Sequence, residues 1–138
     1  MVREIIKDKE ILQQKSVPFI FGEDDYLIKD MLDTANAHEE NCAGLACIQI
    51  GINKKIIVVR ENNKFNVYIN PSIIKRSNKT YVVEEGCLSI DGTSIVKRHQ
   101  SIKLIWTTIN GKNKAKEFTG IIAQIIQHEC DHLNGVLI

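Results

Sequence analysis

Apolar side chains recur at helical spacing in two stretches of the chain. Within residues 24–40 they form a stripe at Leu27, Ile28, Met31, Leu32 and Ala35. This spacing predicts an amphipathic helix, and Asp24 or Asp25 is placed to cap its start. Residues 121–133 are apolar on nearly every side of a helix, with Gly135 placed to end it. This second helix is therefore expected to be buried.

The pattern between these two stretches is that of strands. Short β-branched runs, separated by polar residues, predict strands at 55–60, 65–69, 80–84 and 102–107. The dipeptide Asn110-Gly111 predicts a hairpin turn that leads to a further strand near 115–118. We therefore expect an α+β fold, in which short, mostly antiparallel strands form sheets around a buried C-terminal helix, with one outer N-terminal helix. Residues 1–138 are expected to form a single catalytic domain.

Composition narrows the classes of function. Of the 138 residues, 43% are hydrophobic and 25% are charged, and the formal net charge is +1. Such a balance gives no general attraction to nucleic acid or to anionic membranes. The apolar runs are too short to span a bilayer, and residues 1–8 do not resemble a signal peptide. We expect a cytoplasmic monomer that binds no membrane and has no direct nucleic-acid-binding motif.

The C-terminal helix carries the pattern His-Glu-x-x-His. His128 and His132 lie four residues apart, about 40° from each other around a helix, so both imidazoles can reach one metal ion. Glu129 then projects beside the metal, where a carboxylate can accept a proton from water. Residues 133–138 contain no Cys, His, Asp or Glu. The third ligand is therefore expected earlier in the chain.

The candidates for this ligand are three upstream cysteines, together with His38, His99 and scattered acidic residues. Cys87 follows Gly86 at the end of a predicted strand, where a side chain is held rigidly. Cys42 and Cys47 flank a run of small residues that also permits close approach. His99 follows two basic residues and is interpreted as part of a surface loop. The residue types alone favour Cys87 and leave the other two cysteines open.

Three segments resemble the motifs of the peptide deformylase family. Residues 42–49 (Cys-Ala-Gly-Leu-Ala-Cys-Ile-Gln) are similar to the family's Gly-x-Gly-Leu-Ala-Ala-x-Gln. Residues 85–89 (Glu-Gly-Cys-Leu-Ser) match the second motif, and residues 127–132 match the third, Gln-His-Glu-x-Asp-His. Cys42 and Cys47 stand where the first motif usually has Gly and Ala. We expect these two cysteines to alter the cleft wall and to leave the site intact.

The resemblance implies a catalytic metal centre. Its ligands would be Cys87, His128 and His132, with the fourth position open to water. Glu129 would be the general base, while the Gln49 side-chain amide and the Leu88 N–H would bind the oxyanion. The family favours one Fe²⁺ per chain, with Zn²⁺ or Ni²⁺ expected in some purified samples. The implied reaction removes the formyl group from N-formylmethionyl peptides and releases formate.

The resemblance also implies how the substrate is bound. Nascent chains would be the substrates, with transient proximity to the ribosome. The residues expected to contact substrate are Ala43, Gly44, Gly86 and Arg98. Arg98 could instead brace the cleft or form a surface salt bridge, and Ile121 and Ile125 could line the methionine pocket or simply fill the core.

Other residues near the motif are expected to be structural. We assign Cys130 to the core, Asp131 to an ion pair near the metal ligands, and Gln127 to a structural role. Three rival functions remain open on the sequence alone: a catalytically degenerate formyl-peptide binder, a conventional His-Glu-x-x-His protease, and a structural metal domain.

Overall fold

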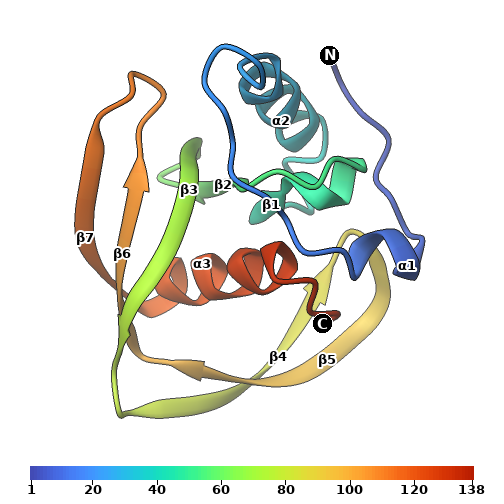
Figure 1. Ribbon diagram of the computed structural model, residues 1–138. Helices are drawn as coiled ribbons and strands as arrows, with labels where there is room; N and C mark the ends of the chain where they lie inside the picture. Colours follow the sequence, from blue (N-terminus) through green and yellow to red (C-terminus); the bar gives the residue numbers. More distant parts are fainter.

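The computed structural model describes residues 1–138 and places the C-terminal helix at the centre of two antiparallel sheets (Figure 1). In chain order the elements are α1 (Lys9–Leu12), α2 (Tyr26–Ala37), β1 (Gly44–Ala46), the 3-10 helix η1 (Cys47–Ile50), β2 (Ile56–Glu61), β3 (Lys64–Arg76), β4 (Thr80–Cys87), β5 (Ile90–His99), β6 (Ser101–Thr107), β7 (Asn113–Thr119) and α3 (Gly120–Leu133). One sheet has the strand order β1-β2-β3-β6-β7, and β4 and β5 form a separate ribbon. The expected α+β class is confirmed.

Strand β2 separates two hydrophobic cores. Ile57 and Val59 face a cluster that includes Ile126 of α3, whereas Ile56 and Val58 belong to a cluster formed with α2. Both faces of β2 are therefore buried, which explains why its first four residues are all apolar. Burial of α3 against this sheet fixes the position of every functional group that the helix carries.

The C-terminal end of α3 has the hydrogen bonds of a Schellman motif. Gly135 N–H donates to His132 C=O at 3.0 Å, and Val136 N–H donates to Asp131 C=O at 3.0 Å. Gly135 has a φ of 75°, and a Cβ at this position would lie 2.3 Å from the Gln13 carbonyl oxygen. The predicted helix end is thus confirmed, and glycine is required there for two independent reasons.

Two elements differ from expectation. Helix α2 is shorter than predicted. Asp25 is its N-cap residue, as one of the two predicted candidates, but its side chain makes no capping hydrogen bond, and Asp24 and Asp25 both accept hydrogen bonds from the preceding turn. Strand β3 continues through Asn70-Pro71, where a register shift against β6 marks a bulge. Asn70 adopts a φ of 50° there, and its side chain bonds the backbone of Phe19, so the bulge is held from outside the sheet.

The sequence did not reveal β5, which pairs with β4 from Thr80 to Cys87. The interpretation of His99 as part of a surface loop is wrong: His99 ends β5, is half-buried, and its Nδ1 lies 2.7 Å from the Ser77 carbonyl oxygen. The hairpin at Asn110-Gly111 is confirmed by the β6–β7 pairing. No helix of the structure combines the length and the apolar character that crossing a membrane requires.

Candidate metal centre and active site

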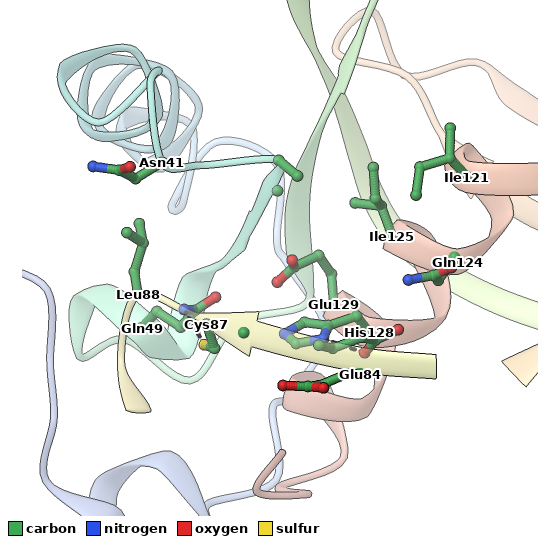
Figure 2. A pocket seen from close by; sticks show the side chains of 14 residues that line it. Asn41, Gln49, Glu84, Cys87, Leu88, Ile121, Gln124, Ile125, His128 and Glu129 are labelled. Atoms are coloured by element: carbon green, nitrogen blue, oxygen red, sulfur yellow. Dashed lines mark hydrogen bonds and ion pairs between the residues drawn. The ribbon is translucent and has the colours of Figure 1, made fainter. Parts of the chain in front are cut away.

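Several distant segments converge on one cleft of about 290 Å³ (Figure 2). Helix α3 forms one wall, and the end of β4 lies opposite it. The segment before β1 and the 3-10 helix η1 complete the lining. The cleft therefore brings together residues from all three motifs found in the sequence.

The three expected metal ligands point their donor atoms at one another. His128 Nε2 lies 3.2 Å from His132 Nε2, and Cys87 Sγ lies 3.4 Å from His132 Nε2. All three donor atoms lie within 4.8 Å of one another. In a tetrahedral zinc site with ordinary bond lengths, N···N and S···N edges are roughly 3.3 and 3.5 Å. The donor set thus fits a single divalent ion of this size.

A buried chain of charges orients His128. Its Nδ1 lies 2.8 Å from Glu85 Oε1, which leaves Nε2 free to face the centre. Arg98 binds the Glu85 carboxylate through two nitrogens, at 3.0 and 2.7 Å, and contacts Asp131 through the third at 2.5 Å. Burial opposes ionisation of Glu85, but the bonds from His128 and Arg98 outweigh it and lower its pKa to about 2.

The pKa values of the two imidazoles are shifted in opposite directions. Burial disfavours a charged His128, yet its bonds to Cys87 and Glu85 prevail and raise its pKa to about 10. Burial and the neighbouring His128 lower the pKa of His132 to about 3. A metal ion bound here would therefore compete with the proton on His128.

Glu129 is a buried carboxylate without a hydrogen-bond partner on Oε1. It is 4% exposed, and burial raises its pKa to about 7. A carboxylate with this pKa can both accept and return a proton near neutral pH. Figure 2 shows the Glu129 oxygens pointing into the cleft, near the side chains of Cys87 and His128.

The expected oxyanion donors, the Gln49 amide and the Leu88 N–H, belong to residues that line the cleft with Cys87. Gln49 Oε1 accepts the Ala46 N–H at 2.9 Å, which fixes the amide with Nε2 toward the site. Nε2 is 3.3 Å from Cys87 Sγ and 3.2 Å from Ser89 Oγ. The Leu88 N–H makes no backbone hydrogen bond and lies next to Cys87 in the chain. Sequence reasoning gave no role to Ser89, although it belongs to the second motif.

The other cysteines lie apart from the donor set. Cys42, Cys47 and Cys130 are all buried, and burial raises the pKa of each thiol to about 12. The Cys42 thiol donates to the Gly44 carbonyl at 3.2 Å. Cys130 packs in the α3 core, as expected. These thiols are therefore protonated, whereas a metal ligand must be a thiolate.

The residues expected to contact substrate fall into two groups. Ala43, Gly44 and Gly86 line the cleft. Arg98 does not: it is 4% exposed and lies behind the metal ligands, so its geometry favours the bracing role among those considered.

Gly44 lies against the Glu129 carboxylate. A Cβ at Gly44 would come within 2.8 Å of Glu129 Oε2, so only glycine leaves room for the carboxylate. On α3, Ile121 is 63% exposed and lines the cleft together with Ile125. Gln127 forms hydrogen bonds with the backbone of His99, which agrees with the structural role expected for it.

Besides Ser89, two residues of the site escaped sequence reasoning. Glu85, although part of the second motif, received no role; its place two residues before the candidate ligand Cys87 is a signal that could have identified it. Gln124 lines the cleft one helical turn before His128, and its spacing of four residues from a metal ligand was available in the sequence.

Comparisons with known proteins agree with this geometry. A sequence profile of the polypeptide deformylase family matches residues 2–138. A peptide deformylase from Clostridium beijerinckii is 41% identical over 138 residues, which is 100% of both chains. One from Rhizobium meliloti is 39% identical over 141 aligned positions, covering 96% of this chain and 80% of the relative.

Solved structures give the same result. The peptide deformylase of Thermotoga maritima has a TM-score of 0.90 at 30% identity and covers 99% of this chain and 95% of its own. A class I type b peptide deformylase from Acinetobacter baumannii, solved with Met-Ala-Ser bound, has a TM-score of 0.89 at 31% identity, with 99% and 97% covered. Peptide deformylases are metal-dependent hydrolases that remove the formyl group from the N-terminal methionine of nascent chains, and the chain belongs to this family.

Proposed function

We propose that Cys87, His128 and His132 hold the catalytic metal of this deformylase and that Glu129 is its general base. The observation that carries the proposal is the convergence of three donor atoms beside a buried carboxylate that has no protein partner on one oxygen. A divalent ion bound there would supply a Lewis acid that polarises the formyl carbonyl and lowers the pKa of water. A thiolate in the donor set is compatible with Fe²⁺, our proposed native metal, and with Zn²⁺ or Ni²⁺ in purified protein.

Each remaining step belongs to a residue of the chain. Glu129 takes a proton from the water that adds to the formyl carbon. The Gln49 amide and the Leu88 N–H donate to the oxygen of that carbon as its negative charge develops. When the C–N bond breaks, Glu129 returns the proton to the departing amine. The products are formate and a peptide with a free N-terminus.

Substrate is held along the cleft beside these groups. We assign the backbone contacts to Ala43, Gly44 and Gly86, and the methionine side chain to the α3 wall that carries Ile121 and Ile125. The A. baumannii relative, solved with Met-Ala-Ser bound, supports a peptide ligand for this cleft. Arg98 acts through Glu85 on the orientation of His128 and has no contact with substrate in this scheme.

The setting follows from the substrate. We infer that residues 1–138 act as a single catalytic domain and as a monomer. Nascent formylated chains would meet the enzyme close to the ribosome, in the cytoplasm. The expected partners are therefore peptides, with no membrane and no direct nucleic-acid contact.

Formate release tests the proposal. Protein loaded with Fe²⁺ without oxygen should release one formate per molecule of formyl-Met-Ala-Ser consumed. Absence of turnover in metal-loaded wild-type protein would refute the proposed activity and would favour a protein that only binds formyl peptides. Cleavage of unformylated peptides would instead indicate a conventional protease.

A further inference from the structure

Gln124 brings a polar amide into an otherwise apolar part of the cleft wall. It lies on α3 between Ile121 and Ile125, and all three side chains line the cleft. A leucine or isoleucine would continue this apolar surface without burying a polar group. The amide is therefore a feature of the cleft that packing alone does not explain.

Tyr81 fixes the direction in which this amide points. The Tyr81 hydroxyl, which comes from the inner face of β4, donates to Gln124 Oε1 at 2.9 Å. The amide oxygen is thereby held on the side of β4, and Nε2 is left with two N–H groups that bond to no protein atom. Figure 2 shows the nitrogen of Gln124 on the side that faces the interior of the cleft.

Gln124 lies within reach of a substrate side chain in the same cleft. Gln124 and His128 both line the cleft and are four residues apart, which is about 6 Å along the helix axis. In a formylmethionyl peptide, five bonds separate the formyl carbon from the side-chain sulfur, or about 6 Å when extended. A methionine side chain that runs from the donor set along α3 is therefore long enough for its sulfur to reach Gln124.

We propose that Gln124, oriented by Tyr81, is a specificity-determining residue that donates an N–H to an acceptor on the first side chain of the substrate. The inference rests on the deformylase activity proposed above and names the substrate class within it. A thioether sulfur is a weak acceptor. The oxygen of methionine sulfoxide is a strong, polar one. The site thus prefers methionine slightly over its hydrocarbon isostere norleucine, and it also accepts formylmethionine sulfoxide, the oxidised form of the initiator residue.

Three peptides that differ only in the first side chain test this role: formyl-Met-Ala-Ser, its sulfoxide, and formyl-norleucyl-Ala-Ser. The measured quantity is the ratio of kcat/KM for each sulfur-containing peptide to that for the norleucine peptide. From wild type to Gln124→Leu, we expect the sulfoxide ratio to fall about 5- to 10-fold, the value of one neutral hydrogen bond. The methionine ratio should fall about 2-fold, because the thioether is the weaker acceptor.

Two further variants separate donation from mere polarity. Gln124→Glu keeps the size of the side chain and an oxygen for Tyr81 but replaces the N–H donors with an acceptor, so it should lose the sulfoxide preference as Gln124→Leu does. Tyr81→Phe leaves the Gln124 amide free to rotate, so we expect a partial loss of the sulfoxide preference. Gln100→Leu is the matched control, because Gln100 is exposed and lies outside the cleft; it should keep the wild-type ratios.

The outcomes are distinguishable from failure of the proposed activity. Equal sulfoxide ratios in wild type and Gln124→Leu, with turnover intact, would refute the role of Gln124 alone. Absence of turnover on all three peptides would refute the deformylase proposal. In that case calorimetry still tests the role of Gln124, through the affinities of wild type and Gln124→Leu for Met-Ala-Ser, its sulfoxide and norleucyl-Ala-Ser. Equal affinities of the two proteins for each peptide would refute donation by Gln124. Circular dichroism and metal content verify that each variant is folded and loaded.

Discussion

Replacing Gly44 with alanine should disturb the general base directly. The added Cβ would lie 2.8 Å from Glu129 Oε2, 2.8 Å from Ile125 Cγ2 and 3.1 Å from Glu129 Cγ. Comfortable contacts between such atoms begin at about 3.5 Å, so the neighbours must move by about 0.7 Å. Gly44 has no positive φ, so backbone strain is not the cause. Overpacking of this kind costs about 1–3 kcal/mol of stability.

The effect on catalysis should exceed the effect on folding. Glu129 Oε1 has no hydrogen bond to hold it, so the carboxylate gives way before the helix does. A displacement approaching 1 Å can lower activity by roughly 10²-fold. We therefore expect Gly44→Ala to lower kcat/KM for formyl-Met-Ala-Ser by about 10- to 100-fold.

Urea unfolding and formate release measure the two effects separately. Gly86→Ala serves as the control for folding, because a Cβ there would meet nothing nearer than 3.8 Å. Gly86→Ala should change the free energy of unfolding by less than about 1 kcal/mol. Wild-type stability and wild-type activity in Gly44→Ala would refute the argument that the glycine makes room for the base.

Two other changes test the ligand set and its support. Cys87→Ser should weaken Zn²⁺ binding far more than Cys47→Ser, because the Cys47 thiol is buried away from the donor atoms; equal losses in a chelator competition assay would overturn the ligand assignment. Arg98→Met should cost about 3–5 kcal/mol in urea unfolding, because it removes the guanidinium that binds both oxygens of the buried Glu85 carboxylate. The exposed Lys29 also pairs with a carboxylate, and Lys29→Met should leave the free energy of unfolding nearly unchanged; similar costs for the two changes would show that burial of the Arg98 pair does not matter.

The parts of the site that follow from local geometry were predictable from the sequence. The spacing of His128 and His132 determines that they share a face of α3, and Gly135 marks where that helix ends. Cys87 comes close to these residues because β4 packs near α3. The spacing of residues along the sequence does not predict this packing. On residue types alone, three cysteines remained candidates, and burial and donor geometry now distinguish Cys87 from the others.

The β4–β5 ribbon shows why β5 was missed, although a strand at 80–84 was predicted and is confirmed as part of β4. Its exposed face carries Val82 and Ile95, which are 69% and 75% exposed, while its buried positions include Glu85 and Arg98. In most strands the apolar residues are buried and the charged ones are exposed, and in this ribbon the arrangement is reversed. The polar residues are inside because they orient a metal ligand, so the pattern of β5 departs from that of a structural strand.

The central claim is that Glu129 transfers protons beside a metal held by the other three residues. The most direct test compares wild type with Glu129→Gln for metal content and for formate release from formyl-Met-Ala-Ser. The account predicts one metal ion per chain in both proteins and a loss of turnover of about 10²- to 10⁴-fold in the variant, the usual contribution of a general base. Wild-type turnover by Glu129→Gln would contradict it.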